Sequence, residues 1–233
     1  MGELYNLLFY QPILNTLIFF YKIFDNFGLA IICLTLFIRG LLIPLTLPAI
    51  RSAKKIKKLT PELDKIKKKY NHDKKRLQQE QLKFYKTHGI NPASGCLPYI
   101  LQFFILITLY RAFMFFIAGG GKIDDVLVNT RFLWLDLTTP DPYWILPILA
   151  GASQLVLSKM MTTETQKVAE VQKKKKEDLA DTMGEMQKQM VYLMPLMTVL
   201  IGARLPSGLA LYWVVTTLFS VGQQYIVYGG KKP

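Results

Sequence analysis

A single arginine lies in the middle of an apolar stretch that is long enough to cross a membrane. Residues 28–50 read GLAIICLTLFIRGLLIPLTLPAI, and Arg39 has eleven residues on either side within this stretch. A charge at the centre of a membrane helix costs roughly 3 kcal/mol on insertion scales, and on the order of 10 kcal/mol or more in simulations. Arginine cannot lose its proton to avoid this cost, and the nearest interface is about 15 Å away. Arg39 therefore needs an anion or a water-filled space.

The four other candidate spans, given below, contain no carboxylate that could neutralise Arg39, because none of them includes Asp or Glu. They do contain neutral polar side chains, and Thr35 precedes Arg39 by one helical turn. Taken singly, each neutral residue is most simply a helix–helix hydrogen-bonding group. If they converge, they line a hydrophilic groove with one fixed cation, which would attract acidic peptide segments. The candidate groove residues are Thr35, Arg39, Gln102, Gln154, Ser158, Trp213 and Thr217.

The apolar stretches and the basic charge balance together indicate an all-α polytopic membrane protein. The chain is 51% hydrophobic and has a formal net charge of +13. Lys and Arg number fourteen in 51–90, two in 119–142 and seven in 158–189, so loops rich in basic residues alternate with a loop that has few. The positive-inside rule then places the N-terminus outside and the C-terminus in the cytoplasm.

The predicted order of segments begins with an interfacial helix and continues through five spans. Residues 1–27 are apolar but interrupted by polar side chains, which favours an amphipathic helix in the membrane interface, with a sixth span as the alternative. The loop at 119–143 contains FLWLDL, which suits an aromatic belt at the interface. We expect spans at 28–50, 92–118, 144–161, 190–204 and 205–228, an external loop at 119–143, and cytoplasmic segments at 51–91, 162–189 and 229–233.

The segment 51–91 is predicted to form a basic helical hairpin outside the membrane. Apolar residues recur at steps of three and four between Ile56 and Tyr70, as in a coiled-coil stripe, and residues 71–73 break the pattern. The charge of this hairpin is either a solvated face that fixes topology or a contact surface for anionic headgroups, RNA or acidic proteins. The candidate contact residues are Lys54, Lys58, Lys68, Lys69, Lys74, Lys75 and Arg76.

No pattern in the sequence points to catalysis or to a cofactor. The two histidines, His72 and His88, have no arrangement of Cys or carboxylates around them that would suggest a metal site. The sequence has no phosphate-binding loop and no Gly-x-Ser-x-Gly motif. We therefore expect a protein that is not an enzyme and that holds neither a metal nor a cofactor.

Four stretches of the chain resemble the YidC-type membrane protein insertases. They are the first span with Thr35, Arg39 and Pro44; NPASGCLPYILQ at 91–102; FLWLDLTTPDPYWILPIL at 132–149; and LPSGLALYW at 205–213. The resemblance covers nearly the whole chain, including the charged hairpin between the first two spans. It implies five spans around a hydrophilic groove that opens to the cytoplasm and to lipid and is closed on the outer side.

The resemblance also implies a function and residue roles. The groove arginine of the family matches Arg39, and its groove glutamine and tryptophan correspond to Gln154 and Trp213. The family inserts and folds small membrane proteins in the bacterial plasma membrane, alone or with the Sec translocon and without ATP hydrolysis. The implied partners are nascent membrane proteins, anionic lipids, the Sec translocon, the ribosome and the signal recognition particle receptor, with no specific nucleic acid. The surface along which a substrate helix leaves would include Phe103, Ile107, Met194 and Met197.

Two other function classes fit parts of the sequence. An anion transporter or channel that uses Arg39 is the main alternative, although transporters often show inverted repeats or paired broken helices, which we do not find. A membrane-anchored docking protein that works through the basic hairpin would leave Arg39 unexplained.

Overall fold

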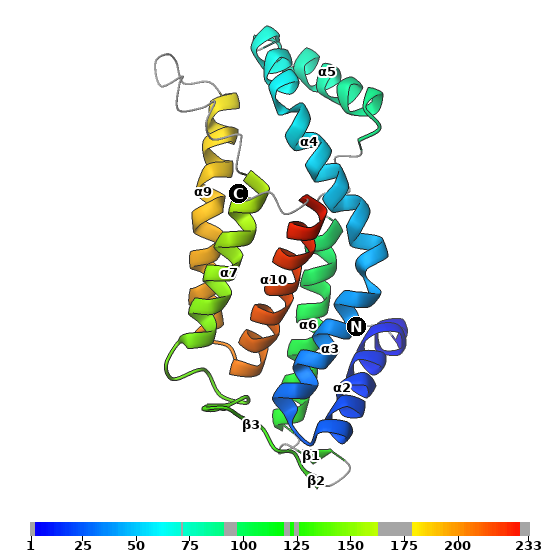
Figure 1. Cartoon of the computed structure of the whole chain (residues 1–233), viewed down its shortest axis with the longest axis vertical. Helices are drawn as coiled ribbons and strands as arrows, with labels where there is room; N and C mark the ends of the chain where they lie inside the picture. The colour runs from blue at the N-terminus through cyan, green and yellow to red at the C-terminus, as the bar shows by residue number, and fades with distance from the viewer. Residues whose placement is uncertain are drawn as a thin grey trace.

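The computed structural model describes residues 3–70, 72–90, 97–118, 122–123, 126–162 and 179–228. Long helices dominate these residues and run side by side as a bundle (Figure 1). A pair of helices projects from one end of the bundle, and short strands lie at the other end (Figure 1). The predicted all-α class is therefore confirmed.

The helices and strands follow one another along the chain with few interruptions. Both strand pairs are antiparallel and only two residues long on each side. The helices are α1 Glu3–Tyr5, the π-helical turn η1 Asn6–Tyr10, α2 Gln11–Phe24, α3 Phe27–Leu41, α4 Ile43–Lys69, α5 Lys74–Thr87, α6 Leu97–Ala118, α7 Ile145–Thr162, α9 Leu179–Gly202 and α10 Ser207–Tyr228; the strands are β1 Lys122–Ile123, β2 Val126–Leu127, β3 Arg131–Phe132 and β4 Leu135–Asp136.

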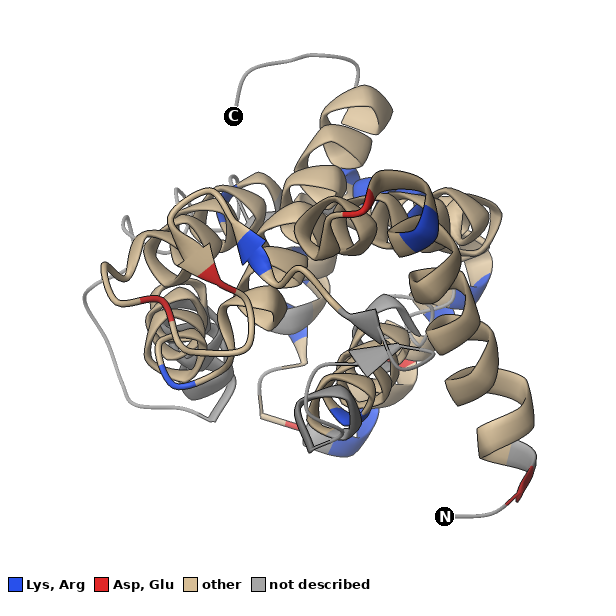
Figure 2. Ribbon diagram, turned by 90° about the horizontal axis from the view of Figure 1, so that it is seen from below, with Lys and Arg blue, Asp and Glu red and all other residues tan. Residues whose placement is uncertain are grey.

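Helix α10 is the centre of the bundle. It packs along α7 and α3 and also contacts α4, α6 and α9. The pair α7–α9 lies on one side of it and the pair α2–α3 on the other (Figure 1). Figure 2 looks along the bundle from the end that carries the strands. Because α10 is surrounded by other helices, polar side chains on it can face protein instead of lipid.

The first predicted span, 28–50, is not one straight helix. Helix α3 ends at Leu41, α4 begins at Ile43, and the two parts are bent by 66°. Pro44 explains the break, because its ring has no N–H to donate and clashes with the carbonyl of the residue four positions earlier, Gly40. Helix α4 then runs on to Lys69, so the first arm of the basic hairpin is a direct continuation of this helix.

The fourth predicted span, 190–204, is the last part of a longer helix. Helix α9 begins at Leu179, so residues 179–189 of the predicted cytoplasmic loop 162–189 are helical. Residues 163–178 of that loop lie outside the described residues. The sequence of this extension, LADTMGEMQKQ, is polar and gives no hydropathy signal that would join it to the apolar stretch after it. The apolar part of α9 is Val191–Gly202.

The number of membrane spans stays a prediction. Among the described residues, Asn6–Phe24 is long and apolar enough to cross a membrane, and the bent pair Phe27–Leu41 and Ile43–Ile56 is a second candidate if it counts as one span. Three more apolar helices are shorter, with 10–17 residues each: Leu101–Met114, Ile145–Met160 and Val191–Gly202. By length and composition Asn6–Phe24 fits the sixth-span alternative, and the choice between a span and an interfacial helix for residues 1–27 stays a prediction.

The N-terminal turns pack against α6. The Tyr5 and Thr108 hydroxyls lie 2.9 Å apart and share a hydrogen bond, and the rings of Phe9 and Phe104 meet edge to face with centroids 4.9 Å apart. The guanidinium of Arg111 lies over the Tyr5 ring, 5.5 Å from its centroid. The second arginine in an apolar helix is therefore held at the bundle surface by an aromatic partner.

The loop between α6 and α7 ties helix ends together. At the start of α10, the Ser207 N–H donates to the Thr139 carbonyl at 2.8 Å. At the start of α3, the Phe27 N–H donates to the Asn129 carbonyl at 3.3 Å. Leu137 of the same loop is fully buried in the core. The loop thus satisfies backbone groups that helix termini leave without partners and packs against the end of the bundle.

Candidate functional site

The side chain of Arg39 lies between three helices. Arg39 is in the last turn of α3, and its Nε–H donates to the Thr216 hydroxyl on α10. A terminal nitrogen of the guanidinium donates to Gln102 Oε1 on α6. Gln102 Nε2 in turn donates to the Tyr212 hydroxyl on α10, at 3.0 Å. These four residues form one hydrogen-bonded cluster, which we call the Arg39 network.

The Arg39 network contains one positive charge and no negative charge. Arg39 is partly buried, and within the described ranges its hydrogen-bond partners are an amide and a hydroxyl, with no carboxylate among them. A guanidinium has five N–H donors, and these two bonds use two of them. Neutral partners orient the guanidinium but leave its charge without a counter-ion. The remaining donors are suited to water or to an anionic ligand.

Two of the candidate groove residues make local hydrogen bonds instead. Thr35 and Thr217 are both buried, and each hydroxyl donates to the carbonyl four residues earlier in its own helix, at 2.6 and 2.8 Å. The α10 threonine that contacts Arg39 is Thr216, one position before the residue that the sequence suggested. Adjacent residues of a helix face directions about 100° apart, so only one of the two can point at Arg39.

Three other candidates lie outside the Arg39 network. Gln154 and Ser158 are partly buried on α7, which packs against α9 and α10, whereas the hydrogen bonds of Arg39 go to α6 and α10. Trp213 packs against the hydrophobic core from a partly buried position. Of the seven candidates, the structure joins only Gln102 to Arg39, and a groove role for the others stays a proposal.

Helix α10 carries a polar stripe that was not among the predicted groove residues as a whole. Tyr212, Thr216, Ser220 and Gln224 follow one another at intervals of four, the spacing that places residues on one helix face. Tyr212 and Thr216 belong to the Arg39 network. Gln224 is 6% exposed, and its Oε1 has no hydrogen-bond partner among the described residues. A check for polar residues at intervals of four would have found the stripe in the sequence.

Comparison with known proteins identifies the group to which this bundle belongs. Residues 19–232 match the family model described as 60Kd inner membrane protein. The chain belongs to the 60Kd inner membrane protein family. It is similar to the membrane protein insertase YidC of Fusobacterium nucleatum, with 37% identity over 229 residues that cover 97% of this chain and 98% of that protein. The resemblance to YidC-type insertases is thus confirmed.

Other similar proteins are longer than this chain. Membrane protein insertase MisCA of Bacillus subtilis is 36% identical over 88% of this chain and 71% of its own length. For YidC of Shewanella halifaxensis, 37% identical, the match covers 94% of this chain but 36% of that protein. A crystal structure of an active YidC insertase aligns with a TM-score of 0.62 over 98% of this chain and 47% of that chain, at 24% identity. This last likeness concerns the fold.

The residues expected along an exit surface lie on two helices with outward apolar faces. Phe103 on α6 is 64% exposed, Met194 and Met197 on α9 are also exposed, and Ile107 is partly buried. Helix α9 carries further exposed apolar side chains in the same region. They are Tyr192, Leu193, Leu196, Leu200 and Ile201.

Lys54 differs from the expectation that it faces an external partner. Its Nζ donates to the Val227 carbonyl at 2.7 Å and lies 5.7 Å from the centroid of the Tyr228 ring. The last carbonyls of a helix lack internal partners and carry the negative end of its dipole, so Lys54 caps the C-terminal end of α10. A second bond nearby joins Gln223 Nε2 to the Thr46 hydroxyl at 3.0 Å. Helix α4 is therefore attached to α10.

The other basic candidates on the hairpin are solvent-exposed where they are described. Lys58, Lys69, Lys75 and Arg76 are exposed, and the side chains of Lys68 and Lys74 lie outside the described residues. The hairpin turns at Asp73, whose carboxylate caps α5 by accepting from the Arg76 N–H at 3.0 Å. These exposed cations leave the anionic-contact reading of the hairpin open.

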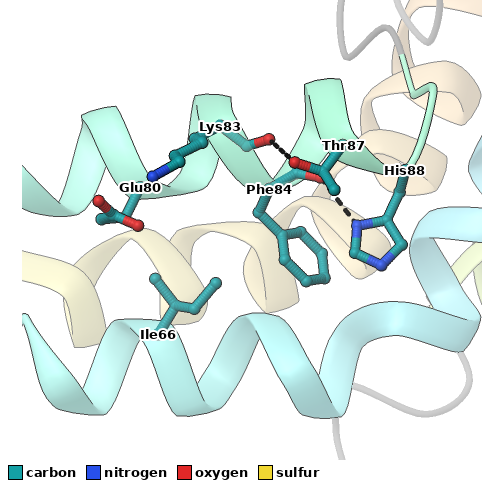
Figure 3. Close-up of a pocket in the computed structure, with 6 residues that line it drawn as sticks. All are labelled: Ile66, Glu80, Lys83, Phe84, Thr87 and His88. Carbon is teal, nitrogen blue, oxygen red and sulfur yellow. Dashed lines mark hydrogen bonds between the residues drawn. The ribbon is translucent and has the colours of Figure 1, made fainter.

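A cleft of about 200 Å³ lies between α4 and α5 (Figure 3). Its polar groups are directed largely at their own helix, since the Thr87 hydroxyl donates to the Lys83 carbonyl at 2.8 Å and the His88 Nδ1–H donates to the Phe84 carbonyl at 2.9 Å. Nearby, burial raises the pKa of the Tyr85 hydroxyl, so it stays neutral at physiological pH. We assign no ligand to this cleft. It is lined by Ile66, Glu80, Lys83, Phe84, Thr87 and His88.

Proposed function

We propose that this chain is a membrane protein insertase that holds the polar tail of a nascent membrane protein at the Arg39 network. The observation that carries the proposal is a partly buried cation whose hydrogen-bond partners among the described residues are all neutral, in a helical bundle whose curated relatives are named insertases. A buried charge without a fixed counter-ion gains most from a transient one. Acidic side chains in the entering tail supply that counter-ion.

The proposed mechanism needs no nucleotide. The tail enters from the cytoplasmic side and shortens its apolar path by passing through the hydrated groove. The membrane potential, about 2.3 kcal/mol per charge per 100 mV, draws acidic residues outward. The apolar helix of the substrate then partitions into lipid along the outward faces of α6 and α9. That burial of apolar surface drives the step.

The short apolar part of α9 supports the exit route. Val191–Gly202 rises about 18 Å as a helix, while the hydrocarbon core of a bilayer is roughly 30 Å thick. A short apolar face is accommodated by local thinning of the bilayer. A thinner bilayer beside α9 lowers the barrier for the polar tail of the substrate.

The proposal also covers the topology of the chain, its partners and the rest of the groove. We propose five spans with the N-terminus outside and the C-terminus cytoplasmic, and an interfacial helix at residues 1–27. We also propose that the chain cooperates with the Sec translocon. Ribosome and signal recognition particle receptor contacts are proposed for the exposed basic face of the hairpin, together with anionic lipids. Gln154, Ser158 and Trp213 are proposed to line the groove away from the Arg39 network. The anion-transporter alternative has no support from the relatives, which are named insertases.

Insertion into proteoliposomes tests the proposal. The purified chain is reconstituted alone, a single-span substrate with a short acidic tail is added, and protease protection of the tail is measured. We expect protection with the wild type and with Arg39→Lys, and a loss of tenfold or more with Arg39→Ala. The matched control is Arg111→Ala, which removes the other arginine in an apolar helix and should insert normally. Equal insertion by all four proteins would contradict a role for the Arg39 charge.

A further inference from the structure

Two exposed apolar residues at the strand-bearing end of the bundle have backbone conformations that their types rarely adopt. Leu133 has φ 55° and Trp144 has φ 58°, in the left-handed region that disfavours bulky residues. Leu133 is 75% exposed and Trp144 is 48% exposed, so packing within the protein offsets little of this strain. Strain at exposed positions points to a role for the side chains outside the fold.

Leu133 occupies a position where glycine would be expected. Phe132 pairs with Leu135, so Leu133 and Trp134 are the two loop residues of the β3–β4 hairpin. A positive φ at the first loop residue normally selects glycine. Leu135 is buried in the core, whereas Trp134 is 45% exposed. The base of the hairpin is held in the bundle, and its tip presents two large apolar side chains.

Trp144 is an unusual residue type for the N-cap position of α7. The Ile148 N–H donates to the Trp144 carbonyl at 3.0 Å, so Trp144 stands where Ser, Thr, Asp or Asn usually caps a helix. The capping is done by Asp141, whose Oδ2 accepts from the Leu146 N–H at 2.8 Å. Trp144 is followed on α7 by the exposed apolar residues Ile148 and Leu149. It therefore continues an apolar stripe that faces out of the bundle.

We propose that Leu133, Trp134, Tyr143 and Trp144 insert into the bilayer interface at this end of the bundle, and we call these four residues the interfacial anchor. Tyr143 is 68% exposed. Trp and Tyr favour this depth because their rings leave water while the N–H and O–H groups stay hydrated. Continuity with the outward stripe of α7 selects lipid as the occupant. In the proposed topology the anchor lies in the outer leaflet, and it fixes the depth of the loop that packs against the start of α10.

Tryptophan fluorescence tests the interfacial anchor directly, because the chain has three Trp residues. Variants that keep only Trp134 or only Trp144, with the others changed to Phe, are reconstituted in phosphatidylcholine–phosphatidylglycerol vesicles. Lipids brominated near the glycerol or near the chain end serve as quenchers, with iodide in the water. We expect both residues to be quenched at least twofold more by the shallow bromines than by the deep ones, with little effect of iodide. Strong quenching by iodide would overturn the proposal, because the residues would then face water. No quenching by any agent would also overturn it, because a protein partner would then cover them.

A second variant separates strain from lipid contact. Asn tolerates a positive φ but is polar, so Leu133→Asn should raise the thermal midpoint in detergent while it halves the shallow-bromine quenching of Trp134. The control Leu82→Asn changes an exposed apolar residue on α5 (54% exposed) and should leave the quenching unchanged. Unaltered quenching in Leu133→Asn would overturn the anchor. Neither readout uses insertion. The anchor is therefore tested independently of the insertase activity, and the same quenching is expected in the Arg39→Ala variant.

Discussion

Lys54 Nζ and the Val227 carbonyl oxygen lie 2.7 Å apart, so an amino group of α4 closes the C-terminal end of α10. The two residues are 173 positions apart in the chain. Helix α10 also carries Tyr212 and Thr216 of the Arg39 network. The projecting hairpin and the buried cation are therefore attached to the same central helix.

Replacing Lys54 should loosen the end of α10. Lys54→Met keeps the length of the side chain but removes the charge that caps the helix, which costs about 0.5–1 kcal/mol. We expect faster hydrogen exchange of the last turn of α10, measured by mass spectrometry. Lys55→Met is the matched control, because Lys55 is exposed. Equal exchange in both variants would show that the contact does not hold the helix end.

Gly208 should tolerate no side chain. A Cβ there would lie 2.4 Å from the Phe113 ring and 3.2 Å from the Leu137 carbonyl, and Phe113 is fully buried. Gly208→Ala is expected to destabilise the fold by about 1–3 kcal/mol through overpacking, seen as a lower thermal midpoint in detergent.

A second glycine on α10 provides the control for that experiment. A Cβ at Gly222 meets nothing within 4 Å, so Gly222→Ala should stabilise the helix by roughly 0.5–1 kcal/mol. A similar change of thermal midpoint in both variants would contradict the close contact at Gly208.

Adjacent threonines on α10 should differ in their effect on insertion. Thr216→Val removes the hydroxyl that accepts from Arg39 and should reduce insertion of acidic-tailed substrates tenfold or more, because a lost hydrogen bond to a charged group costs about 1.5–3 kcal/mol. Thr217→Val removes only a bond within the helix and should insert normally. Protease protection in proteoliposomes measures both. A larger loss of insertion in Thr217→Val than in Thr216→Val would indicate that Thr217, the residue predicted from the sequence, is the one that acts in the groove.

Placing a carboxylate beside Arg39 should stabilise the fold and impair the function. Gln102→Glu supplies the missing counter-ion in the Arg39 network, so the thermal midpoint should rise while insertion of an acidic tail falls about tenfold, equivalent to about 1.4 kcal/mol of lost attraction. Gln102→Met has a similar volume, removes the hydrogen bonds and keeps the cation uncompensated, so it should lower stability instead. Unchanged insertion by Gln102→Glu would argue that the groove needs only water and not charge.

Local signals in the sequence predicted where helices form better than how the helices pack against one another. The stretch expected at 144–161 is helical as α7, Ile145–Thr162, and the stretch at 205–228 is helical as α10, Ser207–Tyr228, while their crossing of a membrane stays a prediction. Apolar runs bounded by polar or turn-forming residues define both. The bend at Leu42 also had a local cause, Pro44, which hydropathy ignores. The early part of α9, residues 179–189, gave no such local signal, because a hydropathy scale does not separate a polar helix from a loop.

The Arg39 network shows where sequence reasoning stops. The cost of burying a charge is intrinsic to Arg39, so its need for polar partners follows from the sequence alone. The choice of Gln102 and Thr216 over Gln154 and Thr217 depends on how α6, α7 and α10 are rotated about their axes. That rotation is set by packing between distant segments, and no spacing within one helix specifies it.

The burial of α10 at the centre of the bundle has a consequence for how this protein itself is made. Helix α10 carries the polar stripe of Tyr212, Thr216, Ser220 and Gln224, and lipid offers these side chains no hydrogen-bond partners. Among the described helices it is also the last to be synthesised. The surfaces of α3 and α7, already in place, supply the partners that lipid lacks. We therefore expect the last described helix to enter the membrane against a protein surface built from earlier segments of the same molecule.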